Sequence, residues 1–190
     1  MELKIIAEAG VNHNGKIETA LKLVDAAKES GADYIKFQTF KANDLVIDSA
    51  PQARYQIKNS NIKESQLSML KKLELKEIDF KKIYEYCKKL NIGFLSSGFS
   101  PRDFAILDQY KMDYLKIPSG EITNILLLEY VANNNSYSKI ILSTGMSNLR
   151  EIDEAINILK KNGVSENSIT LLHCTSEYPA PLDSINLKAM

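Results

Sequence analysis

Residues 5–37 read IIAEAGVNHNGKIETALKLVDAAKESGADYIKF. The short apolar run Ile5–Ala9 predicts a buried strand, and in Ile17–Ser30 apolar residues recur at intervals of three and four, which predicts an amphipathic helix. Gly31 stands where a C-cap glycine belongs, and a second apolar run, Tyr34–Phe37, follows it. The stretch is therefore a strand–helix–strand unit of the kind that builds parallel sheets.

The same alternation continues along the chain. Further strands are predicted at Ile92–Ser96, Tyr114–Ile117, Ile140–Leu142 and Ile169–Leu172, and further helices at Asp79–Leu90, Pro101–Tyr110, Ile125–Asn133 and Leu149–Lys161. Alternating strands and helices indicate a parallel α/β sheet, either doubly wound or closed into a barrel. Because Ala9–Gly15 contains no G-x-G-x-x-G fingerprint, a dinucleotide-binding fold is disfavoured. We expect a parallel (β/α) TIM-type barrel.

A long segment, Lys41–Lys76, separates the second strand from its helix, with a charged helical piece at Glu64–Leu75. Connections of this length usually serve as lids or binding loops. It leaves from the carboxyl end of the strand, where such barrels place their active sites.

The chain length predicts an incomplete barrel. A complete eightfold barrel needs about 250 residues, whereas this chain has 190 and ends after the sixth strand. Either the sequence is a fragment, which we favour, or another chain completes the barrel. We expect residues 1–190 to be the amino-terminal part of the barrel domain, without strands seven and eight.

Composition narrows the class of protein. Lys plus Arg total 24, Asp plus Glu total 24, and 44% of residues are hydrophobic. Disorder and non-specific nucleic-acid binding are both disfavoured, because there is neither a charge excess nor a shortage of apolar residues. The two cysteines, Cys87 and Cys174, are too few for a disulfide scaffold. With no apolar run near 20 residues and no cleavable signal pattern at Met1–Lys4, a cytoplasmic protein is expected.

Polar side chains follow each predicted strand. In chain order they include Glu8, Lys36, Gln38, Ser96, Ser97, Lys116, Ser119, Glu121, Ser143, Thr144, His173, Thr175, Ser176, Glu177 and Tyr178. In a parallel barrel these strand ends converge on one mouth. Two lysines among hydroxyls and carboxylates suit an anionic, oxygen-rich ligand such as a phosphate ester.

Lys36, Lys116 and Glu8 carry the most weight, because each lies within an apolar strand and a buried charge is costly without a partner or ligand. The serines are weaker candidates, since hydroxyls also cap helices. His13 is interpreted as a turn residue, His173 as a core histidine and Cys174 as core filler. No histidine or cysteine pair has metal-ligand spacing, so the sequence predicts no metal site of its own.

Taken together, the strand ends closely resemble those of the sialic acid synthases, the phosphoenolpyruvate-condensing N-acetylneuraminate synthases and related nonulosonate synthases. The resemblance covers nearly the whole chain through six ordered motifs, namely Ile6–Gly15, Tyr34–Phe40, Phe94–Phe99, Lys116–Glu121, Ile141–Met146 and His173–Pro179.

The resemblance implies an enzyme of the transferase class that condenses phosphoenolpyruvate, N-acetylmannosamine and water into N-acetylneuraminate and phosphate. It also implies a divalent metal, Mn²⁺ or Mg²⁺, with ligands beyond this chain, a homodimer and a C-terminal antifreeze-like domain. The 190 residues alone are expected to be inactive. The alternatives are a legionaminate or other nonulosonate synthase that uses a 2,4-diacetamido-trideoxy sugar, a Schiff-base aldolase acting through Lys36 or Lys116, and a non-catalytic anion-binding remnant.

The resemblance also assigns roles residue by residue. By motif, the phosphoenolpyruvate pocket comprises Lys36, Ser97, Lys116, Ser119, Ser143 and Ser176. The sugar-binding and acid–base residues are Glu8, Gln38, Glu121 and Tyr178, and among all of these Glu8, Lys36 and Glu121 are the candidate catalytic residues.

Overall fold

The structure, a computed structural model, describes residues 3–60, 62–134, 137 and 139–189. Met1 and Glu2, on which part of the signal-peptide argument depends, lie outside the described residues. The chain divides into two compact units. The first lies within residues 1–52 and 63–113, and the second within residues 53–62 and 114–190.

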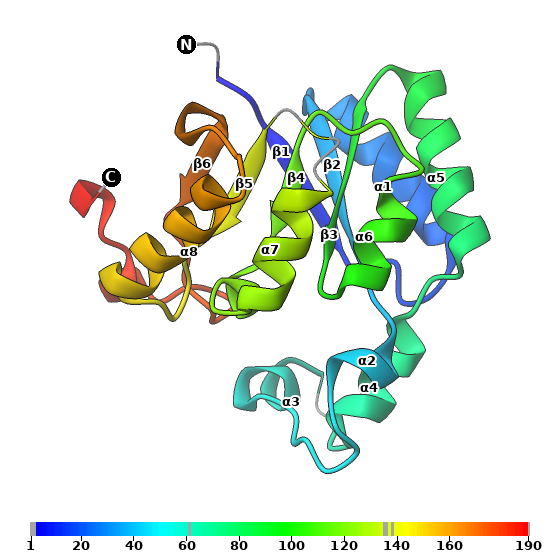
Figure 1. The fold of residues 1–190 in the computed structure, drawn as a ribbon. Coiled ribbons are helices and arrows are strands. Elements are labelled where there is room, and N and C mark those ends of the chain that lie inside the picture. The colour runs from blue at the N-terminus through cyan, green and yellow to red at the C-terminus, as the bar shows by residue number, and fades with distance from the viewer. Residues whose placement is uncertain (1–2, 61, 135–136, 138, 190) are drawn as a thin grey trace. The chain divides into compact units, whose positions relative to one another are not determined.

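The first unit is built on three parallel strands, β1 (Ile6–Gly10), β2 (Tyr34–Thr39) and β3 (Gly93–Gly98), paired in that order (Figure 1). Its helices are α1 (Ile17–Glu29), α2 (Ala42–Leu45), α4 (Gln66–Leu73), α5 (Glu77–Leu90) and α6 (Pro101–Leu107). Helix α1 contacts β1, β2 and α5, and α5 contacts β3, so helices cover one face of these strands.

Strand β2 shows how the sequence separates the two faces. Ile35, Phe37 and Thr39 are buried, whereas the alternate residues are only half-buried. Successive side chains of a strand point to opposite faces. Lys36 and Gln38 therefore share the face away from the apolar layer, which is where a ligand-binding residue of a barrel strand belongs.

The second unit has its own three parallel strands, β4 (Leu115–Ile117), β5 (Ile140–Ser143) and β6 (Ile169–Leu172), also paired in chain order. Its helices are α3 (Arg54–Ser60), α7 (Ile125–Asn133) and α8 (Leu149–Lys161), with short 3₁₀ turns at η1 (Ser119–Glu121), η2 (Glu166–Ser168), η3 (Leu182–Ser184) and η4 (Leu187–Ala189).

Local signals for helix ends are confirmed. Gly31 follows α1 with φ +77, a left-handed conformation that glycine adopts without steric cost. Helix α8 begins with a capping box, in which the Asn148 side chain accepts from the Glu151 backbone N–H and the Glu151 side chain accepts from the Asn148 N–H. Of the two predicted caps for this helix, Ser147 and Asn148, the structure selects Asn148.

One predicted helix end needs correction. Helix α6 ends at Leu107 rather than Tyr110, and the Tyr110 ring packs 5.0 Å from that of Tyr84 and 5.7 Å from that of Phe94. This aromatic packing holds Tyr110 in the turn after the helix. In the segment Lys41–Lys76, helix α4 confirms the helical piece predicted at Glu64–Leu75, and two further short helices, α2 and α3, precede it. Only α2 and α4 belong to the first unit.

Among the described residues, no helix is both long enough and apolar enough to cross a membrane.

Candidate active site

An ion pair joins the middle of β1 to the middle of β2. Glu8 and Lys36 are register partners, and Lys36 Nζ lies 2.6 Å from Glu8 Oε2. Lys36 Nζ also lies 3.4 Å from the hydroxyl of Ser97 on β3. The Lys36 side chain is 11% exposed and that of Glu8 is 48% exposed, so the lysine is sheltered while the carboxylate reaches solvent.

The lysine keeps binding capacity beyond these two contacts. An ammonium group has three N–H donors, of which Glu8 and Ser97 take two. An anion that approached Lys36 would therefore meet an oriented donor with its carboxylate partner to one side. This arrangement satisfies the buried charge and still leaves it able to bind a ligand.

Gly10 makes room beside this pair. It has φ +53 and follows a register irregularity between Glu8 and Gly10. A Cβ built at Gly10 would lie 3.2 Å from Glu8 Oε1 and 3.7 Å from Gln38 Nε2. The second oxygen of Glu8 and the amide of Gln38 therefore flank the same backbone position, where the absence of a side chain leaves both accessible.

In the second unit, Lys116 lies within β4 and is 5% exposed. Its Nζ donates to the Ile117 carbonyl at 2.8 Å. Lys116 is the register partner of Ile141, and Ser143 lies two residues further along β5. Because side chains alternate between faces, Lys116 and Ser143 share one face of this sheet.

A hydroxyl cluster forms around Gly145, after β5. The Ser119 hydroxyl accepts from the Gly145 N–H at 3.0 Å. A Cβ built at Gly145 would lie 2.6 Å from Ser176 Oγ and 2.9 Å from Ser119 Oγ. The loops after β4, β5 and β6 thus meet at one point, as expected for the carboxyl ends of parallel strands. We call Ser119, Gly145 and Ser176 the hydroxyl cluster.

The other predicted residues of this unit have different neighbours. Glu121, in η1, accepts from the Asn124 side chain at 2.7 Å. Tyr55 lies on α3, and the centroid of its ring is 6.3 Å from the centroid of the Tyr178 ring. Tyr55 and Gly145 were not among the predicted site residues. Gly145 had a signal, because it lies within the Ile141–Met146 motif.

The structure thus sorts the predicted site residues into two groups. Glu8, Lys36, Gln38 and Ser97 belong to the first unit. The second unit holds Lys116, Ser119, Glu121, Ser143, Ser176 and Tyr178.

The two histidines have opposite environments. His13 is 1% exposed in the turn after β1, where its Nδ1 accepts from the Gly15 N–H at 3.1 Å, which confirms a turn residue. Burial lowers the pKa of His13. His173 is exposed and its Nε2 accepts from the Asn186 N–H at 3.1 Å, so its interpretation as a core histidine is wrong. The strand that precedes it is itself only partly covered.

Within the described residues, no three His, Cys, Asp or Glu side chains group in a way that could hold a metal ion.

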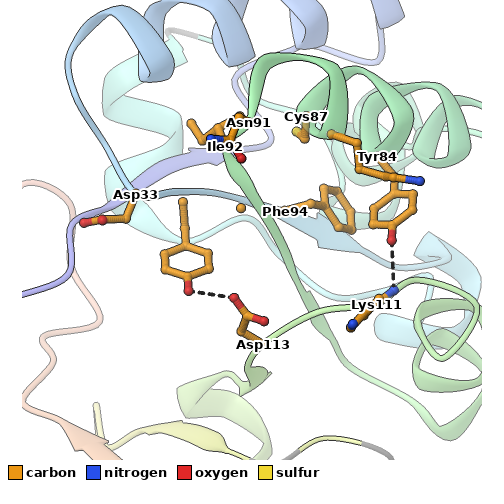
Figure 2. Close-up of a pocket in the computed structure, with 11 residues that line it drawn as sticks. Asp33, Tyr84, Cys87, Asn91, Ile92, Phe94, Lys111 and Asp113 are labelled. Atoms are coloured by element: carbon orange, nitrogen blue, oxygen red, sulfur yellow. Dashed lines mark hydrogen bonds between the residues drawn. The ribbon is translucent and has the colours of Figure 1, made fainter.

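A hollow of about 490 Å³ lies at the other end of the first unit's strands (Figure 2). Asp33 precedes β2, and Tyr34 and Gly93 begin β2 and β3, whereas Ser97 lies toward the carboxyl end of β3. Figure 2 shows a hydrogen bond between Lys111 and Tyr84. The backbone N–H of Lys111 donates to the Tyr84 hydroxyl at 3.3 Å. The hollow is therefore distinct from the group around Lys36.

Parallel strands that alternate with helices along the chain define an α/β protein of the TIM-barrel class. The profile of the NeuB family matches residues 23–190, and the chain belongs to that family.

Solved structures support the fold. The N-acetylneuraminic acid (sialic acid) synthetase of Leptospira borgpetersenii, crystallised with citrate, superposes with a TM-score of 0.82 and 31% identity, over 98% of this chain and 60% of that one. A truncated 3-deoxy-D-arabino-heptulosonate 7-phosphate synthase from Thermotoga maritima, at 15% identity and TM-score 0.59, covers 88% of this chain and 50% of that one and shares the fold alone. The predicted class, a partial TIM-type barrel with six parallel strands, is confirmed.

Curated relatives favour the stated alternative over the first predicted activity. The chain is 52% identical over 98% of its length to the N,N'-diacetyllegionaminic acid synthase of Campylobacter jejuni, and 48% identical over 98% to that of Legionella pneumophila. It is 27% identical over 98% to the human N-acetylneuraminate-9-phosphate synthase. The prediction of N-acetylneuraminate as the product is thus supported only at the family level. The alternative of a legionaminate or other nonulosonate synthase is better supported. The chain spans 55% and 52% of the two legionaminic acid synthases and 50% of the human enzyme.

Proposed function

We propose that this chain is part of a nonulosonate synthase of the legionaminate type. The full-length enzyme condenses phosphoenolpyruvate with a 2,4-diacetamido-trideoxy sugar and water, and releases phosphate. The identities of 52% and 48% to two N,N'-diacetyllegionaminic acid synthases support the legionaminate type. The Lys36 ammonium held between Glu8 and Ser97 supports the binding of an anionic substrate such as phosphoenolpyruvate. The ion pair carries the chemistry, because it offers a sheltered cation with a donor to spare.

Phosphoenolpyruvate carries a phosphate and a carboxylate, and each needs donors. Lys36 and Ser97 supply them in the first unit. In the second unit, Lys116 and Ser143 share a face of the sheet, and Ser119 and Ser176 flank Gly145. Charged and hydroxyl donors that are fixed before the ligand arrives stabilise negative charge without reorganising during the reaction.

The reaction forms one carbon–carbon bond and one carbon–oxygen bond from water, and it breaks the carbon–oxygen bond to phosphate. The methylene carbon of the enol attacks the aldehyde carbon of the open-chain sugar, and the aldehyde oxygen takes up a proton. Water adds to the enol carbon that carries the phosphate, and the tetrahedral intermediate expels phosphate to leave the keto acid. Orienting the two substrates replaces a bimolecular encounter with an effectively unimolecular step.

Two carboxylates are available for the proton transfers. Glu8 contacts Lys36 through Oε2, while its Oε1 lies beside the open position at Gly10. Glu121 is anchored by the Asn124 amide. We assign to Glu8 and Glu121 the tasks of accepting the proton of the attacking water and protonating the sugar oxygen.

The proposal for the full-length protein includes the other features that the resemblance implies, namely a divalent metal, a homodimer and a cytoplasmic location. A bound metal would polarise the aldehyde or activate water.

The test is phosphate release from phosphoenolpyruvate by the full-length gene product, with Mn²⁺ present and each acceptor supplied in turn. We expect release with the 2,4-diacetamido-trideoxy sugar and a much lower kcat/KM with N-acetylmannosamine. A higher kcat/KM with N-acetylmannosamine would restore the N-acetylneuraminate assignment. Failure to release phosphate with any amino sugar would refute the synthase itself.

A further inference from the structure

Helix α3 stands apart from the rest of the segment Lys41–Lys76. The residues on either side of it, up to Gln52 and from Lys63 onward, belong to the first unit, whereas Ala53–Ile62 belongs to the second. Helix α3 thus groups with the second unit, although the residues that flank it in the sequence group with the first. This grouping requires a specific contact between α3 and the rest of the second unit.

An aromatic pair supplies such a contact. The half-buried ring of Tyr55 on α3 lies 6.3 Å from the ring of Tyr178, with 40° between the two planes. Tyr178 follows β6 and is 64% exposed. Tilted aromatic pairs at this separation attract one another, so Tyr55 fixes one side of the Tyr178 ring while much of that ring stays open to a ligand.

The pair lies close in sequence to the hydroxyl cluster. Ser176, two residues before Tyr178, has its Oγ 2.6 Å from the Cβ position of Gly145. An acceptor sugar that meets phosphoenolpyruvate beside the hydroxyl cluster would therefore have an aromatic surface from the same loop available to it. Aromatic side chains that surround a few fixed polar groups are typical of sites for small ligands.

We propose that Tyr55 is a specificity-determining residue that, with Tyr178, forms an aromatic wall against the apolar substituents of the acceptor sugar. A 2,4-diacetamido-trideoxy sugar presents two acetamido methyl groups and a deoxygenated carbon, whereas N-acetylmannosamine presents one acetamido methyl group and more hydroxyls. An apolar ring surface favours the former. The role rests on the proposed function, because it concerns selection between two acceptors of that reaction.

The test uses the full-length gene product and its Tyr55→Ala and Tyr55→Phe variants. We expect Tyr55→Ala to lower kcat/KM for the diacetamido sugar by about tenfold or more, with less effect on N-acetylmannosamine, the range typical of lost apolar contacts in a pocket. The KM for phosphoenolpyruvate is expected to stay within about twofold, since phosphate and carboxylate do not contact the wall. Tyr55→Phe keeps the ring and is expected to keep the selectivity.

Lys58→Ala is the matched control, because Lys58 lies on the same helix and is exposed. It is expected to change neither the selectivity nor the KM values. If Tyr55→Ala loses its thermal unfolding transition, Tyr55→Leu replaces it, since leucine retains apolar volume without a ring. An unchanged selectivity ratio in a folded variant that lacks the ring would overturn the role of Tyr55 alone. Absence of phosphate release in the unmodified enzyme would instead refute the proposed function.

Discussion

Lys36 Nζ and Glu8 Oε2 lie 2.6 Å apart across neighbouring parallel strands, with the lysine sheltered and the carboxylate open to solvent. Their register pairing brings the two charges together on one face of the sheet. The pair satisfies a lysine that would otherwise be costly to bury. Each partner can therefore be tested separately for its part in the chemistry.

Replacing Glu8 by glutamine is expected to lower kcat by about 100-fold or more, because general acid–base groups contribute roughly that much. The KM for phosphoenolpyruvate is expected to change far less, since Lys36 and Ser97 remain. Steady-state kinetics of the full-length enzyme measure both constants. A Glu8→Gln enzyme with kcat within twofold of the unmodified enzyme would remove Glu8 from the proton transfers.

Replacing Gly145 by alanine is expected to raise the KM for phosphoenolpyruvate by about tenfold or more, with the fold retained. The new Cβ would lie 2.6 Å from Ser176 Oγ and 2.9 Å from Ser119 Oγ, so the hydroxyl cluster must move apart. Gly120→Ala is the control, because nothing lies within 4 Å of a Cβ there. Equal effects of the two substitutions would show that the hydroxyl cluster does not bind this substrate.

Cys87 is expected to resist thiol reagents in the folded protein. Burial raises the pKa of the Cys87 thiol to about 12, so almost no reactive thiolate forms near pH 8. Cys174 is only partly buried and is expected to react first. Alkylation with iodoacetamide followed by peptide mass spectrometry distinguishes them. Rapid labelling of Cys87 without prior unfolding would contradict its placement against the sheet.

Acidification is expected to destabilise the protein partly through His13. Burial lowers the pKa of His13 in the folded state, so below an unfolded pKa of about 6.5 the unfolded chain binds the proton more readily. Stability from this residue is complete above that pH and is lost as the pH falls through it. The difference between the thermal unfolding midpoints at pH 7 and pH 5 should be smaller in His13→Gln than in the unmodified protein. His173→Gln, at the exposed histidine, is the control and should leave the difference intact.

Much of the fold could be predicted because local sequence patterns determine the positions of many helices and strands. Helices α7 and α8 and strand β6 have the predicted bounds, since apolar period and end signals both lie within each segment. The predicted strands at β2 and β3 end too early, at Phe37 and Ser96. Gln38 and Ser97 continue the two strands, because their backbones pair with each other. Pairing is a property of two segments, and neither sequence shows it alone.

The sequence by itself determined the order of elements and the residue types that follow each strand, because these depend on local periodicity and residue identity. It also indicated the family, through the resemblance of six ordered motifs. Only the tertiary structure decided which side chains meet. It paired Lys36 with Glu8, placed Ser119 and Ser176 around Gly145, and set Tyr55 against Tyr178 from more than a hundred residues away. These contacts join segments distant in the chain, so they depend on strand register and loop packing, which local preference does not encode.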